Sequence, residues 1–437
     1  MDRRDLRFSG WGLVLVAALA LGAAGIYQFA WSSIRLPIGE RVGAPEPALG
    51  TVFTLFVVFQ TLGQFPAGWV RDRYGPRLPS LVGALCLTGG FSGIAVAGSL
   101  PAVYLAYAVG GIGVAIVYTV SINTTVKWFD DRRGLATGVV GMCFSGFSFL
   151  AIPAIRRGVA DTFEGTLFAL AAGVGGAALV AALVLRDPPS ATSAGGGSAD
   201  AAGAADDEAD DDETAADIET AKTDNAGQDI HPTDERAWTW RQAVRTWQFW
   251  LLYAVFIVSN GVGLMIIGKI VSFATALSLP AAAATASASA VALSEAGGVV
   301  IGGSLSDRLG RRRTVAASLV LSGVSLAGAV AVGVEGLAAG FVALVGAAAF
   351  FRTPMFAVFP SLVAEYYGRT YSSENYAALY TAKLFGGVFA GTVASALVIS
   401  IGWAASFALG AVLIALAGVA VVFLRPVEAG GGVVRGS

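Results

Sequence analysis

The chain carries one short motif twice, GWVRDRYGPR at 68–77 and GSLSDRLGRR at 303–312. Each copy joins two apolar stretches that are long enough to cross a bilayer. The copies occupy equivalent places in two successive sets of six such stretches, so the sequence predicts two six-helix halves that arose by duplication. The motif residues are Gly68, Asp72, Arg73 and Gly75 in the first half and Gly303, Asp307, Arg308 and Gly310 in the second.

The residue types of the motif fit a contact that forms and breaks. Gly68 and Gly303 would let neighbouring helices approach closely. The Asp residue of each copy can sit at a helix N-terminus or pair with an Arg of a neighbouring loop, and the Arg residues can anchor at phospholipid headgroups. An ordinary basic loop would explain the Arg residues but not the matched spacing. We therefore expect both copies to latch one conformation of this side of the protein.

Composition extends the prediction to the whole chain. Of its 437 residues, 55% are apolar and 13% are charged, with a mean hydropathy of +0.70, whereas soluble domains carry about 25% charged residues. These values exclude a water-soluble enzyme and predict an all-α polytopic membrane protein with twelve transmembrane helices. The expected spans are roughly 10–34, 49–70, 78–98, 101–126, 135–155, 164–185, 248–277, 285–305, 314–334, 337–362, 374–399 and 402–424.

Basic residues set the expected orientation of these spans. Outside the spans, the Lys and Arg residues in loops opposite the N-terminus are only Arg35, Arg41, Arg156 and Arg157. By the positive-inside rule, both termini and the central loop should lie in the cytoplasm. We therefore expect a multi-pass protein of the plasma membrane, and we expect it to be a monomer.

Residues 187–237 differ in composition from the rest of the chain. They hold 15 of the 30 acidic residues and almost no large apolar ones, so this segment cannot bury a core and should be a disordered cytoplasmic linker. It would act either as a solvated tether or as a regulatory segment that binds a partner. The expected organisation is an N-terminal half at 1–186, the acidic linker at 187–237, a C-terminal half at 238–425 and a cytoplasmic tail at 426–437.

The doubled motif resembles the signature of the major facilitator superfamily, and five further stretches narrow this resemblance. They are GIYQFAWS at 25–32, GGIG at 110–113, KWFDDRRGLATG at 127–138, FPSL at 359–362 and YTAK at 380–383. These stretches are similar to the oxalate/formate antiporter family, whose members exchange small carboxylates by alternating access. The resemblance implies the major facilitator fold, with two halves related by a pseudo-two-fold axis, and places Lys383 on the family's substrate-binding lysine.

Four ionisable residues fall inside the spans, and all belong to the second half. They are Lys269, Glu295, Arg352 and Lys383. A cation at the centre of a membrane helix costs about 2.5–3.5 kcal/mol on insertion scales, so these side chains should face a central cavity or one another. Three cations against one carboxylate leave the cavity positive. The expected ligand is therefore an anion whose charge is held by the second half.

Lys383 is the leading candidate for holding that anion. Tyr376, Tyr380 and Lys383 follow one another at i, i+4 and i+7, so they should line one helix face and offer two hydroxyls and an ammonium group to a carboxylate. Alternatively, Lys383 lies at shallow depth and its side chain snorkels to the cytoplasmic surface.

The eighth span departs from the family pattern. The resemblance implies a second substrate-binding cation there, an Arg at about position 299 or 300, but both positions are Val. Arg352, with Phe356 one turn on, could supply this charge from the tenth span. Alternatively, Arg352 pairs with Glu295 and leaves Lys383 alone for a monocarboxylate. Lys269 is either a further charge partner or a side chain that pairs locally or snorkels.

The first half should contribute neutral groups to the cavity. The candidates are Tyr27 and Trp31 on one face of the first span, Gln60 in the second and Tyr118 in the fourth. A Tyr or Trp in a membrane span can instead be an interface anchor. The glycine-rich stretches 110–113 and 134–141 favour helix packing over phosphate binding, because neither is a strand-to-helix turn.

Together these features predict a secondary active transporter that moves small organic anions by alternating access and antiport. Proton-coupled monocarboxylate symport is the alternative, and only Glu295 could serve as its buried acid. A membrane sensor that signals through the linker would need a folded cytoplasmic element, and none is visible. No metal, cofactor, catalytic residue or nucleic-acid partner is expected, since His231 is the only His and no paired carboxylates lie near the cavity. The expected partners are the anion and the lipid bilayer.

Overall fold

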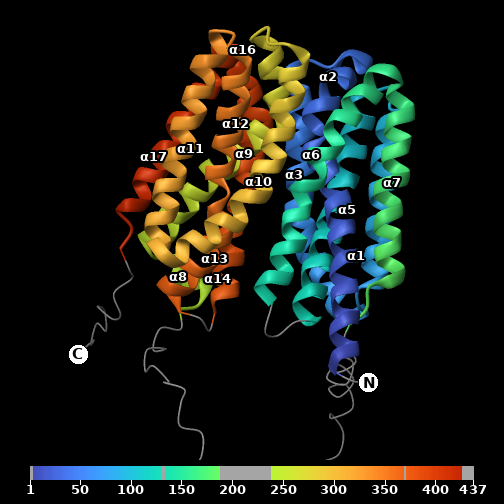
Figure 1. The fold of residues 1–437 in the computed structure, drawn as a ribbon, viewed down its shortest axis with the longest axis vertical. Helices are drawn as coiled ribbons and strands as arrows, with labels where there is room; N and C mark the ends of the chain where they lie inside the picture. The colour runs from blue at the N-terminus through green and yellow to red at the C-terminus, as the bar shows by residue number, and fades with distance from the viewer. Residues whose placement is uncertain (1–2, 129–132, 188–237, 369–370, 426–437) are drawn as a thin grey trace, which may run out of the picture.

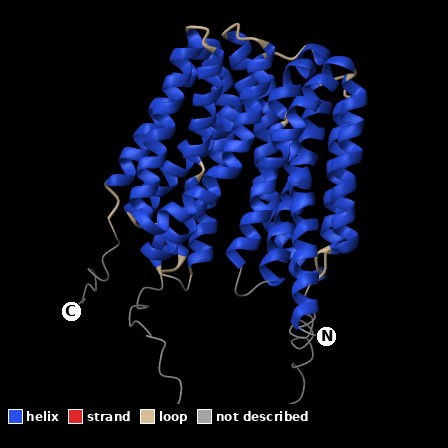
Figure 2. Ribbon diagram, in the orientation of Figure 1, coloured by secondary structure: helices blue, strands red, loops and turns tan. Residues whose placement is uncertain are grey.

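The computed structural model describes residues 3–128, 133–187, 238–368 and 371–425. Within these ranges, twelve helical spans are long and apolar enough to cross a membrane, and helices dominate the whole bundle (Figure 2). The predicted class, an all-α polytopic membrane protein with twelve spans, is confirmed. The acidic linker and the C-terminal tail lie outside the described residues, apart from Asp187.

The first half contains α1 (Arg3–Phe29), α2 (Trp31–Val42), α3 (Glu46–Tyr74), α4 (Arg77–Val96), α5 (Leu100–Trp128), α6 (Arg133–Asp161) and α7 (Phe163–Val184). The second contains α8 (Trp240–Ala243), α9 (Trp247–Ala276), α10 (Ala281–Leu309), α11 (Arg311–Val334), α12 (Ala338–Arg352), α13 (Pro354–Tyr367), α14 (Ser372–Tyr380), α15 (Ala382–Val388), the π-helix η2 (Phe389–Val393), α16 (Ala394–Ile401) and α17 (Trp403–Val422). In Figure 1, α1 begins and α17 ends at the lower end of the bundle, which we call the base, and α2 lies at the opposite end, which we call the top.

The two halves repeat the same helix packing. In the first half α3 packs against α5 and α4 against α7, and in the second α10 packs against α12 and α11 against α17. The doubled motif forms matching turns, because Gly75 (φ +73°) ends α3 and Gly310 (φ +87°) ends α10. An L side chain is strained at such positive φ values, so both positions favour glycine. Packing and turns thus agree with the predicted duplication.

Large apolar side chains cover the outside of the bundle. Phe65 is 83% exposed and Leu150 73% exposed, and many other Leu, Val and Phe side chains share this surface. A soluble protein rarely exposes apolar area on this scale. The surface is therefore suited to lipid acyl chains.

Two spans that the sequence pattern predicts as continuous are interrupted. The tenth divides at Thr353, since Pro354 has no N–H to continue the hydrogen-bond ladder. The eleventh breaks at Thr381 and then widens into η2. Thr54 of α3 satisfies backbone groups near this π-turn, because its Oγ1 donates to Gly387 O (3.3 Å) and accepts from Thr392 N (3.1 Å). A side chain of the first half thus stabilises irregular backbone of the second.

The halves lie closest at the top. Figure 1 shows their ribbons diverging toward the base. Hydrogen bonds between the halves join α2 and the upper part of α3 to α9, α15, η2 and α16. Glycines allow this approach, because a Cβ on Gly391 would overlap Thr54 Oγ1 and the carbonyl oxygen of Gly50.

Candidate functional site

Lys383 lies at the boundary between the halves, near the middle of the bundle. Its side chain is largely buried, and its Nζ donates hydrogen bonds to Gln60 Oε1 (3.2 Å) and to Tyr380 Oη (3.5 Å). Gln60 in turn donates to Gln28 Oε1 (3.3 Å). The ammonium group therefore does not snorkel to the surface. Instead, the Gln60 amide of the first half contacts it directly, and Gln28 holds this amide in place.

An aromatic wall surrounds this ammonium group. Tyr376 and Tyr380 have ring centroids 5.8 Å apart, and Lys383 Nζ lies 5.6 Å from the Tyr380 centroid, within cation–π range. The predicted shared face of the three residues is present even though the helix breaks at Thr381 between them. Fully buried Phe256 of α9 backs this wall, 5.7 Å from Tyr380.

The first half closes the other side of the wall. Tyr118 of α5 lies near the hydroxyls of Tyr380 and Tyr376, and the Gln64 amide of α3 lies near the Tyr380 hydroxyl. Gln64 lies one helical turn after Gln60, so both amides share one face of α3. Three tyrosine hydroxyls, two amides and one ammonium group thus lie close together between the halves.

Arg352 forms an ion pair with Glu295 of α10. Its guanidinium group also lies over the Phe356 ring, 5.3 Å from the centroid, and packs against Gly263 of α9, where a Cβ would overlap it. The pair lies within electrostatic reach of Lys383. This geometry matches the alternative in which Arg352 neutralises Glu295. Arg352, Glu295 and Lys383 together then carry a single net positive charge.

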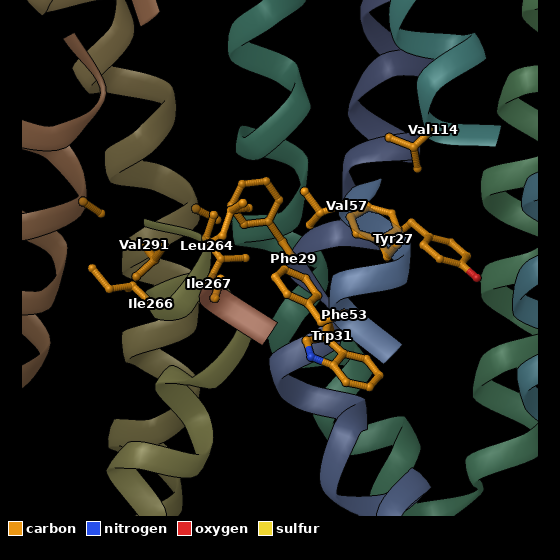
Figure 3. Packing of buried hydrophobic residues seen from close by; sticks show 14 of the residues in the cluster. Tyr27, Phe29, Trp31, Phe53, Val57, Val114, Leu264, Ile266, Ile267 and Val291 are labelled. Carbon is orange, nitrogen blue, oxygen red and sulfur yellow. The ribbon is translucent and has the colours of Figure 1, made fainter. Parts of the chain in front are cut away.

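Two candidates of the first half, Tyr27 and Trp31, lie apart from this cluster. Tyr27 is fully buried inside its own half, and its hydroxyl donates to Ala106 O (3.0 Å) in a space left open by Gly110. Figure 3 shows its ring pointing away from α9. Trp31 stacks on Phe53 with centroids 6.2 Å apart. Tyr27 therefore packs inside the first half, away from the expected cavity, whereas Trp31 lies against Gly268 of α9 at the boundary between the halves.

Lys269 belongs to a separate charged cluster near the top. Its Nζ donates to Glu46 Oε1 (2.9 Å) and to Ser395 Oγ (2.6 Å). Glu46 also pairs with Arg35, which is completely buried. Lys269 therefore neither snorkels nor pairs locally. Its carboxylate partner lies in the other half and more than 200 positions away in the sequence.

The motif residues at the base make contacts within their own half. Asp72 accepts hydrogen bonds from Arg71 (3.1 Å) and from Lys127 Nζ at the end of α5 (3.2 Å). Arg71 is fully buried and also binds Asp187 (2.6 Å), which lies three residues after the end of α7. The partner of Asp72 from another segment is thus Lys127 in the last turn of α5, instead of the expected Arg of a neighbouring loop. The Asp307 side chain lies outside the described atoms.

The motif glycines do not control helix approach as expected. A Cβ on Gly68 would lie 3.7 Å from Thr119, and one on Gly303 would lie 3.5 Å from Ala357, which is ordinary van der Waals contact. The tight positions of α10 include Gly298 and Gly302, where a Cβ would overlap Thr353 and Pro354 respectively. Gly75 and Gly310 are required for their turns, and Arg73 lies over the Trp69 ring at 4.7 Å.

The glycine-rich stretches behave differently from one another. Gly110 and Gly111 of α5 are in close contact with Tyr27 and with Phe56 O, as helix packing requires. Gly138 and Gly141 of α6 have no atom within 4 Å of an added Cβ. The packing interpretation therefore holds at 110–113, and the described part of 134–141 does not show it.

Several residues of these clusters were not predicted from the sequence. Gln28 lies beside Tyr27 in one of the family-like stretches, and the i, i+4 spacing from Gln60 could have indicated Gln64. Arg35 and Glu46 lie in what the pattern treats as a loop, so only their contacts reveal them. Phe256 lies among many apolar residues of α9, and nothing in its local sequence sets it apart.

Comparison with known proteins agrees with this architecture. The family model of the Major Facilitator Superfamily matches residues 13–291 and 258–435. The chain therefore belongs to the Major Facilitator Superfamily, whose members are transporters.

Individual relatives narrow the resemblance. The chain is 27% identical over 416 residues to the oxalate:formate antiporter of Oxalobacter formigenes, which covers 95% of this chain and 91% of the antiporter. It is 28% identical over 169 residues to human monocarboxylate transporter 11, covering 37% of this chain and 36% of that protein. The fold matches a crystal structure of a bacterial homologue of the lysosomal transporter Spinster in an inward-facing conformation, with a TM-score of 0.65, 14% identity and 95% coverage of both chains.

Proposed function

We propose that the protein is a secondary active transporter that exchanges small organic carboxylates across the plasma membrane by alternating access. The observation that carries this proposal is the buried Lys383 ammonium group, which Gln60 of the other half contacts directly. A carboxylate that replaces these amide contacts would bind both halves at once. Substrate binding would then be coupled to the relative position of the halves, as alternating access requires.

The proposed site consists of Lys383, Tyr380, Tyr376, Gln60, Gln64 and Tyr118. Arg352 and Phe356 lie beside it, with Glu295 as the charge partner of Arg352. With the Arg352–Glu295 pair intact, one positive charge remains for the substrate. This balance favours a monocarboxylate, such as formate, lactate or pyruvate, over oxalate, which would need Arg352 to leave Glu295.

Proton-coupled monocarboxylate symport is the second candidate function. The observation that favours it is Glu295, whose side chain is 11% exposed within a membrane span and interacts electrostatically with Lys383. Protonation of this carboxyl group would release Arg352 and change the charge of the site. The partial similarity to a monocarboxylate transporter is compatible with this candidate.

Counterflow in proteoliposomes separates the two candidates. Vesicles are loaded with formate, oxalate, lactate or pyruvate, and uptake of each labelled carboxylate is measured with and without a pH gradient. Antiport predicts uptake that requires an internal carboxylate and does not require the gradient. Symport predicts uptake into empty vesicles that an inward proton gradient drives. Uptake of none of the four carboxylates under either condition would overturn the proposal.

The orientation follows from the basic loops and is also a proposal. We infer that the base, with both termini, faces the cytoplasm and that the top faces outward. The closest approach of the halves would then lie on the outer side. We further infer that one chain suffices for transport, since the proposed site is built from the two halves of a single chain.

A further inference from the structure

The charged cluster near the top is distinct from the proposed substrate site. Lys269 contacts Ser395, which lies 12 positions after Lys383 in the same interrupted span. At a rise of 1.5 Å per residue, Lys383 and Ser395 are about 18 Å apart along the span. The Lys269 cluster therefore lies well above the proposed substrate site. The proposed transport cycle leaves this cluster without an assigned role.

The cluster contains more positive than negative charge. Glu46 is the carboxylate that both Arg35 and Lys269 contact, and the side chains of these two cations are 0% and 3% exposed. Two cations share one carboxylate, so the cluster carries a net charge of +1. A pure lock between the halves would need only one pair, and burial of a second cation costs free energy.

The division of the cluster between the halves explains the second cation. Arg35 and Glu46 both belong to the first half, in α2 and α3, so their ion pair survives when the halves separate. Lys269 and Ser395 belong to the second half, in α9 and α16. Opening of the top would separate Glu46 from Lys269 and Ser395, and Arg35 from Ser272. The Arg35–Glu46 pair and the Lys269–Ser395 contact each lie within one half and would remain. Glu46 therefore stays neutralised by Arg35, whereas Lys269 loses its carboxylate.

We propose that Lys269, with the hydroxyls of Ser395 and Ser272, is a second carboxylate-binding site that is available when the top is open. Glu46 occupies this site when the top is closed, and the carboxylate group of an arriving substrate replaces it. Ser272 lies one turn from Lys269 on α9 and accepts a hydrogen bond from Arg35 in the closed arrangement (3.1 Å), so opening frees its hydroxyl as well. This inference rests on the proposed function, because it takes the substrate to be a carboxylate.

Two substitutions distinguish this site from a simple lock. Glu46→Gln and Lys269→Gln both remove the same ion pair between the halves, so a lock predicts equal effects in the same direction. A binding site predicts opposite effects, because Glu46→Gln unmasks Lys269 and Lys269→Gln removes it. Glu164→Gln is the matched control, since Glu164 forms an exposed ion pair with Arg41 within the first half.

Uptake of labelled formate and oxalate into intact cells provides the first readout. For a carboxylate added outside, the half-saturation concentration should fall by up to about fivefold in Glu46→Gln and rise by a similar factor in Lys269→Gln. The double variant should resemble Lys269→Gln, and the control should resemble the wild type. Equal shifts in both single variants would overturn the binding site in favour of a lock. A gain that persists in the double variant would assign the binding to Arg35 instead and would also overturn the proposal.

A second readout does not depend on transport. Ser272→Cys is introduced after Cys86 and Cys143, the two native cysteines, are replaced by Ser, and intact cells are treated with anionic and cationic methanethiosulfonates. The ratio of anionic to cationic labelling rates should rise in Glu46→Gln and fall about fivefold in Lys269→Gln, and formate should slow labelling only where Lys269 is present. Unchanged ratios would refute the site even if the protein transports carboxylates. If the ratios shift but no carboxylate is transported or protects, the anion site stands and the proposed function fails.

Discussion

At the scale of single residues, the proposed site differs from its surroundings in having a cation without a carboxylate partner. Lys383 has neutral partners, Gln60 and Tyr380, whereas Arg352 has a carboxylate partner in Glu295. A neutral amide or hydroxyl is readily displaced by a substrate anion, since the anion interacts more strongly with an ammonium group. Lys383 is therefore the cation that can bind substrate without first breaking an ion pair.

Substitution of Lys383 tests this view directly. Lys383→Ala should reduce carboxylate affinity by roughly 10-fold to 100-fold, because a hydrogen bond to a charged group contributes about 1.5–3 kcal/mol. Lys383→Arg should retain partial activity at best, since a planar fork does not replace a point charge. Uptake by proteoliposomes, normalised to the amount of folded protein, measures both variants. Near-normal uptake by Lys383→Ala would remove Lys383 from the site.

A double-mutant cycle tests the Arg352–Glu295 pair. Arg352→Gln alone strands a buried carboxylate and should destabilise the protein by about 3–5 kcal/mol, whereas Arg352→Gln combined with Glu295→Gln should recover most of this loss. Thermal unfolding in detergent measures the coupling free energy.

The same variants decide which carboxylates bind. Strong coupling with rescue supports a site that has one free cation and prefers monocarboxylates. Absence of coupling, together with selective loss of oxalate binding in Arg352→Gln, would instead show that Arg352 serves as a second substrate cation.

At the scale of helices, the closed top depends on contact between α3 and the interrupted eleventh span. Gly50 of α3 faces Gly391 of η2, and a Cβ on either residue would overlap the other helix. The π-turn leaves irregular backbone at this level, and Thr54 satisfies it. These features allow the helices to meet without bulky side chains between them, and such contacts can part without leaving charges unpaired.

Substitution of one glycine should therefore disturb this contact. Gly391→Ala should cost about 1–3 kcal/mol in the arrangement with the top closed, as overpacking does. It should lower the unfolding temperature in detergent and increase labelling of Ser272→Cys from the outside. Gly138→Ala in α6 is the matched control, because its Cβ would meet open space. Equal behaviour of the two variants would mean that the contact is not tight in solution.

The motif at the base predicts a different phenotype. Asp72 lies 12 positions after Gln60, the residue of α3 that contacts Lys383. Its carboxylate accepts a hydrogen bond from Lys127 of α5. Asp72→Asn weakens this contact and should lower the maximal exchange rate more than the affinity for substrate. The measurement is a full concentration series of uptake, which separates the two quantities. An equal loss of affinity would contradict a role in conformational cycling.

At the scale of the whole molecule, the two halves meet along α6 and α10 and along α3, η2 and α15. Hydrogen bonds join the halves at the top and at the level of Lys383, and the ribbons diverge toward the base (Figure 1). A relative rotation of the halves would need to break these hydrogen bonds and shift the packing of α6 against α10. We therefore expect the segment that joins the halves to serve as a solvated tether.

Replacement of the linker tests this conclusion. Exchange of residues 189–234 for a Gly/Ser chain of similar length should preserve transport within about twofold, because such a chain spans the same distance without structure. Uptake and membrane insertion are measured together. Loss of uptake with normal insertion would favour a regulatory role for the acidic segment.

Much of the architecture follows from the sequence alone. Apolar length determines where helices can cross a bilayer, since unsatisfied backbone groups are too costly in lipid for other structures, and the doubled motif reveals the duplication. The same local regularity indicates Lys383, Tyr376 and Tyr380, because residues at helical spacing share a face wherever the helix lies.

Only the tertiary structure decided how residues pair across the chain. Arg35, Glu46 and Lys269 come from three helices and both halves, and no local pattern connects them. The sequence places Tyr27 on the same helix face as Trp31, yet its ring packs in the core of the first half, where Gly110 leaves room for it. The sequence allowed Arg352 to bind either substrate or Glu295, and the packing of the helices places it beside Glu295. Helical periodicity fixes the direction of a side chain relative to its own helix, whereas its partner depends on which helix packs against that face.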